Sequence, residues 1–206
     1  QYVVTLWYRP PELLLELPYG LEVDVWSLGC IFVEMFALDS LWQASDTKCQ
    51  IKCIVDTFGI TSFLCPFIEG IGHDQFSRMN SEFGEVEASG LEGTIYAKIK
   101  KLDSLPRRPS SLHLDHTAFD LVRRMLDVDP KNRASVGDSL KHAYFNDLDE
   151  FTQDRCRPYI SDDGISAKPV AIYLALDTKA MMQEHVRNII LRYEGDYAKT
   201  QKRQKR

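Results

Sequence analysis

The sequence predicts a predominantly α-helical protein, and three segments carry that prediction. Residues 21–38 are apolar on nearly every face of a helix, which is typical of a central, buried helix. Residues 46–58 repeat apolar side chains at the spacing i, i+3, i+4 and i+7, between Asp46 as a capping residue and Gly59 as a terminator. Residues 115–126 predict a further helix.

The N-terminal region predicts irregular backbone and one short helix. Residues 1–10 are expected to be extended or loop, because Pro10 and Pro11 disfavour a helix before them. Pro11 suits the first turn of a short helix over residues 12–15. Residues 18–20 then predict a turn ahead of the central helix.

The second half of the chain has weaker patterns. Residues 60–114 show little periodicity and contain five glycines, so we expect irregular structure there with at most one helix, near residues 96–102. Residues 129–133 predict a turn. Ser135, with Asp138 three residues later, resembles a capping box for a short helix ending near His142.

Charge is distributed unevenly along the chain. Residues 199–206 hold five bases and no acid, so residues 1–198 carry 20 bases against 30 acids, a net charge of −10. Phosphate contacts require clustered Lys and Arg, and so acidic a body argues against direct nucleic-acid binding. Residues 146–206 are interpreted as a C-terminal extension, with a predicted helix at 178–195 before the basic tail at 199–206.

The cysteines and the hydropathy of the sequence argue against disulfides, a metal site and a membrane segment. The five cysteines are scattered, which predicts free thiols. Cys49 and Cys53 lie one helical turn apart, but no second ligand pair has zinc-like spacing, so we expect packing on a helix face and no metal site. The longest apolar run, residues 23–38, contains acids and is too short to cross a bilayer, so no membrane segment is expected.

Four short blocks carry a family resemblance. They are VVTLWYRPPE at residues 3–12, DVWSLGC at 24–30, DPKNR at 129–133 and HAYF at 142–145. In this order and at these separations, they resemble the C-terminal lobe of a eukaryotic protein kinase over residues 1–145, with the N-terminal lobe absent. The TLWYR form is similar to the CMGC group. The leucines at 13–15 and the Trp-Gln-Ala at 42–44 look most like its transcriptional cyclin-dependent kinases.

The resemblance implies structural roles for Glu12, Arg133, Asp24 and Trp26. Glu12 and Arg133 match a family ion pair that ties the activation segment to the distal helices. Asp24 matches a buried aspartate that accepts hydrogen bonds from the catalytic loop, and Trp26 belongs to the same block. Taken alone, Glu12 also fits an exposed first-turn acid and Asp24 an ordinary helix cap.

The resemblance also implies substrate-binding roles for Val4, Thr5 and Arg9. Thr5 matches the threonine that contacts the catalytic aspartate, which implies Ser/Thr specificity. Val4 matches a residue held at positive φ in proline-directed kinases, where a proline after the phosphoacceptor forfeits no hydrogen bond. Arg9 marks the same group near that pocket. Local packing of a loop is the plain alternative for Val4 and Arg9.

The motifs that perform catalysis in the family are absent from these 206 residues. The sequence contains no Gly-rich loop, no β3 lysine, no His-Arg-Asp catalytic loop and no Asp-Phe-Gly. We therefore expect no catalytic, cofactor-binding or metal-binding residue in this chain, with ATP and Mg²⁺ belonging to the complete family domain. The resemblance implies a protein substrate with Ser/Thr-Pro, and a cyclin bound through the parent protein.

Two functions remain open at this point. In the first, the chain is a piece of an active kinase and begins inside the activation segment. In the second, it is a truncated, non-catalytic binding module that sequesters substrate or regulatory partners. The composition of residues 199–206 suits a nuclear import signal, which predicts the nucleus, with the cytoplasm otherwise; a solvated terminal charge run is the plain alternative.

Overall fold

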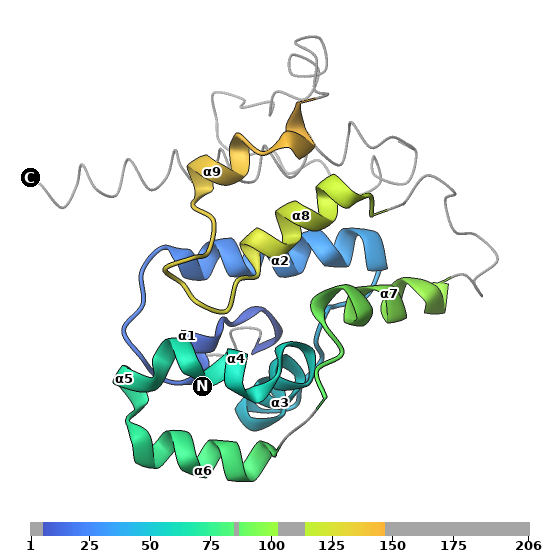
Figure 1. Cartoon of the computed structure of the whole chain (residues 1–206). Coiled ribbons are helices and arrows are strands. Elements are labelled where there is room, and N and C mark those ends of the chain that lie inside the picture. Colours follow the sequence, from blue (N-terminus) through green and yellow to red (C-terminus); the bar gives the residue numbers. More distant parts are fainter. Residues whose placement is uncertain (1–5, 85–86, 103–113, 147–206) are drawn as a thin grey trace, which may run out of the picture. The chain divides into compact units, whose positions relative to one another are not determined.

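The computed structural model describes residues 6–84, 87–102 and 114–146 (Figure 1). Every regular element in those ranges is a helix, and they contain no β-strand, which confirms the predominantly α-helical prediction. The chain divides into two compact units. Of the described residues, 6–84, 87–102 and 114–135 belong to the first unit, and 136–146 belong to the second.

Helix α2 (Glu22–Ala37) is the central element of the first unit. It packs against α7 (Leu91–Leu102), α8 (His116–Met125) and the short 3₁₀-helix η1 (Leu6–Tyr8). Its apolar character on nearly every face follows from these several neighbours, and the predicted central helix is confirmed. Trp26, which is fully buried, stacks on Trp42 with ring centroids 5.5 Å apart.

Helix α1 (Pro11–Leu14) starts with a proline in its first turn, and a left-handed residue follows shortly after its end. The amide of Leu17 donates to the carbonyl of Glu12 at 2.9 Å, while Glu16 adopts a φ of 57°. A non-glycine residue in this conformation costs about 1 kcal/mol. The short helix predicted here is therefore present, and η1 occupies part of the expected loop before it.

Helix α3 (Thr47–Phe58) has the boundaries that its pattern indicated. The Asp46 carboxylate accepts a hydrogen bond from the Cys49 amide at 2.8 Å and caps the first turn. Gly59 ends the helix with a φ of 84°. Asp115 likewise caps α8 by accepting from the Ala118 amide at 2.8 Å.

The expectation of irregular structure over residues 60–114 is wrong in its described part. The segment contains α4 (Ile60–Leu64), η2 (Cys65–Phe67), α5 (Ile68–Ile71), α6 (His73–Phe83) and α7. Gly72 and Gly84 have positive φ and stand at helix ends, so these glycines end helices instead of disrupting them. The first part of the segment shows little periodicity because α4, η2 and α5 are each too short to display a helical period.

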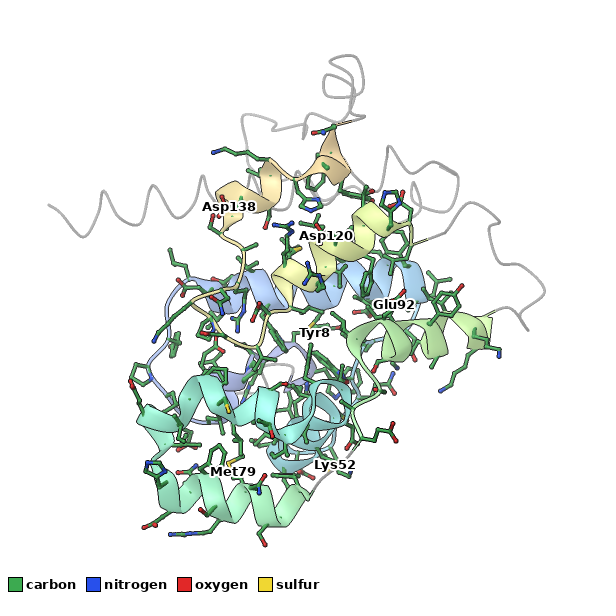
Figure 2. All side chains as sticks on the ribbon, in the orientation of Figure 1. Tyr8, Lys52, Met79, Glu92, Asp120 and Asp138 are labelled. Carbon is green, nitrogen blue, oxygen red and sulfur yellow. The ribbon has the colours of Figure 1, made fainter. Side chains whose placement is uncertain are left out.

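Figure 2 shows the side chains on these helices. Lys52 on α3 is exposed, whereas Met79 on α6 is buried. Across the ranges that the structure describes, no single helix is long and apolar enough to cross a membrane, and one pair bent by 118°, Thr47–Phe58 with Ile60–Ile71, meets the length and composition criteria together.

The described part of the second unit contains α9 (Val136–Leu140) and the 3₁₀-helix η3 (Ala143–Phe145). The predicted short helix near 135–142 is therefore present, and its α-helical part ends at Leu140. The His142 ring accepts a hydrogen bond from the Tyr144 amide at 3.2 Å and caps η3. The predicted helix at 178–195 and the basic tail lie outside the described residues.

The approach of α2 to α8 requires a glycine, which gives a testable prediction. A Cβ at position 29 would lie 2.8 Å from Leu126 Cδ2 and 3.1 Å from Met125 Cβ. We expect Gly29→Val to lower the free energy of unfolding by about 1–3 kcal/mol through overpacking, as measured by urea denaturation.

Gly93 on α7 provides the matched control for that substitution. A Cβ there has no heavy atom within 4 Å. Gly93→Ala should therefore raise the free energy of unfolding by about 0.5–1 kcal/mol, because alanine is the better helix former. A Gly29→Val variant as stable as the wild type would contradict the close packing of α2 on α8.

Candidate functional site

Arg133 and Glu12 form a buried ion pair between segments 121 residues apart in the sequence. Arg133 Nη1 donates to Glu12 Oε1 at 2.7 Å, and Nη2 donates to Oε2 at 3.1 Å. The side chains are 0% and 2% exposed. Two parallel bonds of this kind match the planar guanidinium to the carboxylate. The structure thus brings together the two residues that the family resemblance pairs.

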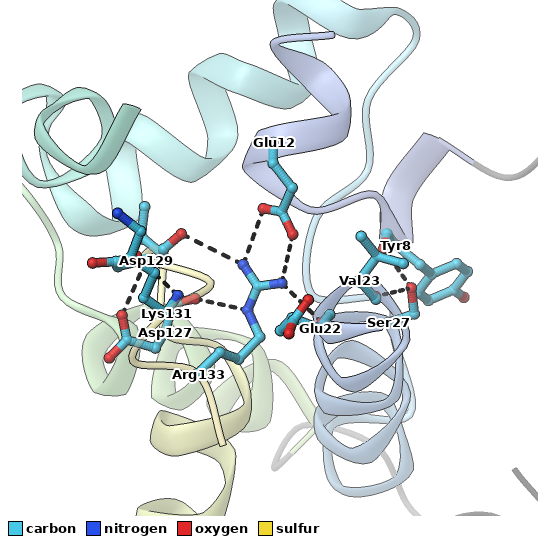
Figure 3. Close-up of polar contacts among 10 residues, drawn as sticks. Tyr8, Glu12, Glu22, Val23, Ser27, Asp127, Asp129, Lys131 and Arg133 are labelled. Carbon is cyan, nitrogen blue, oxygen red and sulfur yellow. Dashed lines mark hydrogen bonds and ion pairs between the residues drawn. The ribbon is translucent and has the colours of Figure 1, made fainter. Parts of the chain in front are cut away.

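The rest of the Arg133 guanidinium is bonded to backbone carbonyls (Figure 3). Nε donates to Asp127 O at 2.9 Å, Nη1 to Glu22 O at 2.9 Å and Nη2 to Val128 O at 3.4 Å. All five guanidinium N–H groups therefore have an acceptor. The guanidinium carbon lies 5.1 Å from the centroid of the Trp26 ring, within range of a cation–π interaction.

Tyr8, at the end of η1, is held by α2. The single hydroxyl hydrogen of Ser27 is shared between the Tyr8 carbonyl at 2.9 Å and the Val23 carbonyl at 3.0 Å (Figure 3). The Tyr8 hydroxyl donates to Glu34 Oε2 at 2.7 Å. Two effects raise the pKa of Tyr8 above its ordinary value near 10. Partial burial is the larger, and the hydrogen bond to the Glu34 carboxylate is the second. The hydroxyl therefore remains a donor at neutral pH.

Trp7 is held by α3 and the loop before it. The Trp7 indole donates to the carbonyl of Ala44 at 2.7 Å, and Gln50 Nε2 donates to the Trp7 carbonyl at 3.2 Å. Gln50 is fully buried, and its Oε1 has no hydrogen-bond partner within the described part of the chain. The backbone carbonyls of Trp7 and Tyr8 are thus bonded to Gln50 on α3 and Ser27 on α2. The two side chains are bonded to the loop before α3 and to Glu34 on α2.

The other predicted site residues have varied environments. Arg9 is partly buried, and its amide donates to Leu6 O at 3.1 Å. Asp24 was expected to be buried and is only partly so, which corrects that expectation. Asp24 lies on the first turn of α2, and the residues just before that turn, 18–21, are exposed. The family resemblance pairs Asp24 with a catalytic loop, and that loop is not among the 206 residues. Val4 and Thr5 lie outside the described residues.

The cysteines show no arrangement suited to a metal ion in the residues that the structure describes. Cys49 is exposed and its thiol donates to the Asp46 carboxylate at 3.2 Å, so the expected packing of both thiols on a helix face is wrong for Cys49. Cys53, one turn later, is half-buried. No group of three or more His, Cys, Asp or Glu in those ranges could hold a metal. Cys30 is fully buried on α2, and burial raises the pKa of its thiol.

The sequence did not direct attention to Gln50 or Ser27, although one signal was present. Gln50 occupies the apolar face of α3 together with Ile51 and Ile54. A polar residue on such a face requires a hydrogen-bond partner when it is buried. That partner, Trp7, is 43 residues away in sequence, so no local pattern could identify it.

The buried pair should dominate stability at this site. We expect Glu12→Ala to lower the free energy of unfolding by about 3–5 kcal/mol, because it leaves the Arg133 charge buried without its counter-ion. The exposed pair Lys52–Asp56, with side chains 58% and 42% exposed, is the control. Lys52→Ala should change stability by no more than about 0.5 kcal/mol in the same urea experiment. Similar losses in the two variants would show that Glu12 is not buried as described.

Comparison with known proteins identifies a family and several relatives. The protein kinase domain family matches residues 1–145. Mitogen-activated protein kinase 10 of Arabidopsis thaliana is 33% identical over 158 residues, which are 75% of this chain and 35% of that protein. Serine/threonine-protein kinase ppk23 of Schizosaccharomyces pombe is 34% identical over 151 residues, 69% of this chain and 32% of that protein. The chain thus spans about a third of the length of these relatives.

Solved kinase structures resemble the fold. The yeast RNA Pol II CTD kinase CTDK-1 complex matches with a TM-score of 0.52 and 28% identity, covering 72% of this chain and 44% of that chain. The MAP kinase LMAMPK10 of Leishmania major matches with a TM-score of 0.52 and 27% identity, covering 73% of this chain and 43% of that chain. The chain therefore belongs to the eukaryotic protein kinase family, in its CMGC group, and its helical fold corresponds to the C-terminal lobe.

Proposed function

We propose that this chain is the substrate-binding lobe of a serine/threonine protein kinase, which phosphorylates Ser or Thr residues followed by proline. The main support is the fixed backbone at residues 6–9, which directly follow Val4 and Thr5 in the sequence. We call residues 4–9 the substrate-binding segment. Four side-chain hydrogen bonds hold Trp7 and Tyr8 within it.

A fixed backbone suits the binding of an extended peptide. A segment that is ordered before the substrate arrives loses little conformational entropy on binding. The backbone that follows the segment is fixed as well. Arg133 binds Glu12 on α1, the start of α2 and the loop after α8, and so connects these three parts. The position of the segment therefore depends on the folded lobe and not on the loop alone.

A complete kinase domain uses ATP and Mg²⁺, and the residues described here do not fit either. Glu12 and Arg133 already satisfy each other at the buried site. The 206 residues also contain no Gly-rich loop that could surround phosphates. We propose that the chain by itself transfers no phosphate, and that its contribution to kinase activity is the placement of a protein substrate.

The subtype that we propose is cyclin-dependent-like, with a cyclin as a partner of the parent protein. The leucines at 13–15 and the Trp-Gln-Ala at 42–44 support it, as does the similarity to a structure of a CTD kinase complex. The MAP kinases are comparably similar, so a MAP kinase type is the competing assignment within the same group.

The proposed function predicts peptide binding without phosphate transfer. The purified 206-residue chain should bind a Ser-Pro peptide about fivefold more tightly than its Ser-Ala counterpart, a difference of about 1 kcal/mol, or one hydrogen bond. Val4→Pro cannot adopt the positive φ that the resemblance assigns to this position, so it should abolish the preference for proline. Tyr96→Ala, at a side chain 68% exposed on α7, should leave the preference unchanged. Fluorescence anisotropy with labelled peptides measures both effects.

Two results would contradict parts of this proposal. Equal affinity for the Ser-Pro and Ser-Ala peptides would contradict the preference for proline. Calorimetric binding of ATP, together with phosphate transfer abolished by Thr5→Ala, would show that the chain is catalytic. Tight peptide binding without transfer in a protein that carries the whole kinase domain would favour a non-catalytic binding module.

We also propose a nuclear location, from the basic composition of residues 199–206. A fluorescent reporter fused to residues 178–206 should accumulate in the nucleus. Replacing the five bases of the tail by glutamine should distribute it evenly. A wild-type fusion that is itself evenly distributed would remove the basis of this proposal.

A further inference from the structure

Gln50 is a buried amide on the packed face of α3. Thr57, the other buried polar residue of this helix, donates its hydroxyl to the Cys53 carbonyl at 2.9 Å. The Gln50 side chain is 0% exposed, beside the buried Ile51 and Ile54. Burying an amide is unfavourable unless hydrogen bonds replace those lost to water. Gln50 forms one such bond, to the carbonyl of Trp7, and leaves its own Oε1 without a partner in the described residues. Packing alone would therefore favour an apolar residue at this position.

The single bond of Gln50 reaches the substrate-binding segment. The distance from Gln50 Nε2 to Trp7 O is 3.2 Å, and Trp7 lies two positions after Thr5. The Trp7 carbonyl belongs to the peptide group that Trp7 shares with Tyr8. On the Tyr8 side, the Ser27 hydroxyl holds the next carbonyl at 2.9 Å. Successive carbonyls of the segment are thus bonded to α3 and to α2.

We propose that Gln50 is a positioning residue for substrate binding. Its carboxamide fixes the Trp7–Tyr8 peptide group, in the segment that directly follows Val4 and Thr5 in the sequence. This inference rests on the proposed function, because it assigns a purpose to the segment that Gln50 holds. It adds a specificity-determining residue on α3, outside the segment and outside every block that carries the family resemblance.

The unpaired Oε1 allows positioning to be separated from stability. Gln50→Met keeps a similar side-chain volume, removes the bond to Trp7 and also removes the buried acceptor that lacks a partner. Loss of a hydrogen bond and relief of an unsatisfied group oppose each other, so global stability should be nearly unchanged. The segment, in contrast, loses one of its tethers. If Gln50 only supported the fold, its replacement would change the order of residues 6–9 and the global stability together.

The experiment compares the 206-residue wild type, Gln50→Met and Ile54→Met. Ile54 is 0% exposed one turn further along α3, which makes its replacement a matched core control. In Gln50→Met, hydrogen exchange within residues 6–9, followed at the Arg9 amide that donates to Leu6 O, should accelerate about three- to tenfold, as expected for the loss of one net hydrogen bond. The preference for a Ser-Pro over a Ser-Ala peptide should fall, while the urea midpoint stays at the wild-type value. Ile54→Met should change neither the exchange nor the preference.

Each other outcome has a distinct meaning. Unchanged exchange at residues 6–9 in Gln50→Met would overturn the proposal, as would equal acceleration in Ile54→Met. Should Gln50→Met fail to fold, Gln50→Leu repeats the test with a smaller side chain, and unfolding of both would assign Gln50 to stability and overturn the positioning role. A wild-type chain that binds neither peptide would contradict the proposed function, while the exchange measurement would still decide whether Gln50 holds the segment.

Discussion

The buried guanidinium of Arg133 is the constraint on which the first unit depends. A charge in that position is tolerated only when every N–H group has an acceptor, and here the acceptors come from Glu12, Glu22 and the residues at 127 and 128. These acceptors belong to α1, to the first turn of α2 and to the loop after α8. Arg133 can therefore be buried only when all three segments are in place, so we expect these segments to fold cooperatively.

Function follows from the same rigidity. The residues that the family resemblance assigns to peptide binding occupy a short segment with little regular structure of its own. Here α2 and α3 supply the order, through Ser27, Glu34 and Gln50. The proposed substrate-binding segment is thus bonded to two helices that pack in the core, which is how a binding site gains a fixed geometry.

The sequence predicted the elements whose signals are local. Helix α3 follows from a capping residue, an apolar period and a terminal glycine, all within 14 residues. The helices between Ile60 and Phe83 were missed for two reasons. Elements α4, η2 and α5 are too short to display a helical period, and the glycines around them suggested irregular backbone. Helix α6 does carry apolar residues at helical spacing, at Phe76, Met79 and Phe83. The pairing of Glu12 with Arg133 came from family resemblance, and the Gln50–Trp7 bond from the structure alone, since contacts between distant residues leave no local pattern.

The separation of 121 residues between Glu12 and Arg133 also has a consequence for biosynthesis. At translation rates of about 5–20 residues per second, Glu12 leaves the ribosome on the order of ten seconds before Arg133 does. During that interval α1 has no counter-ion for its acid, whereas α3 to α6 can form from neighbouring residues. During synthesis, the Glu12 carboxylate therefore cannot form its buried ion pair until the loop after α8 has been made.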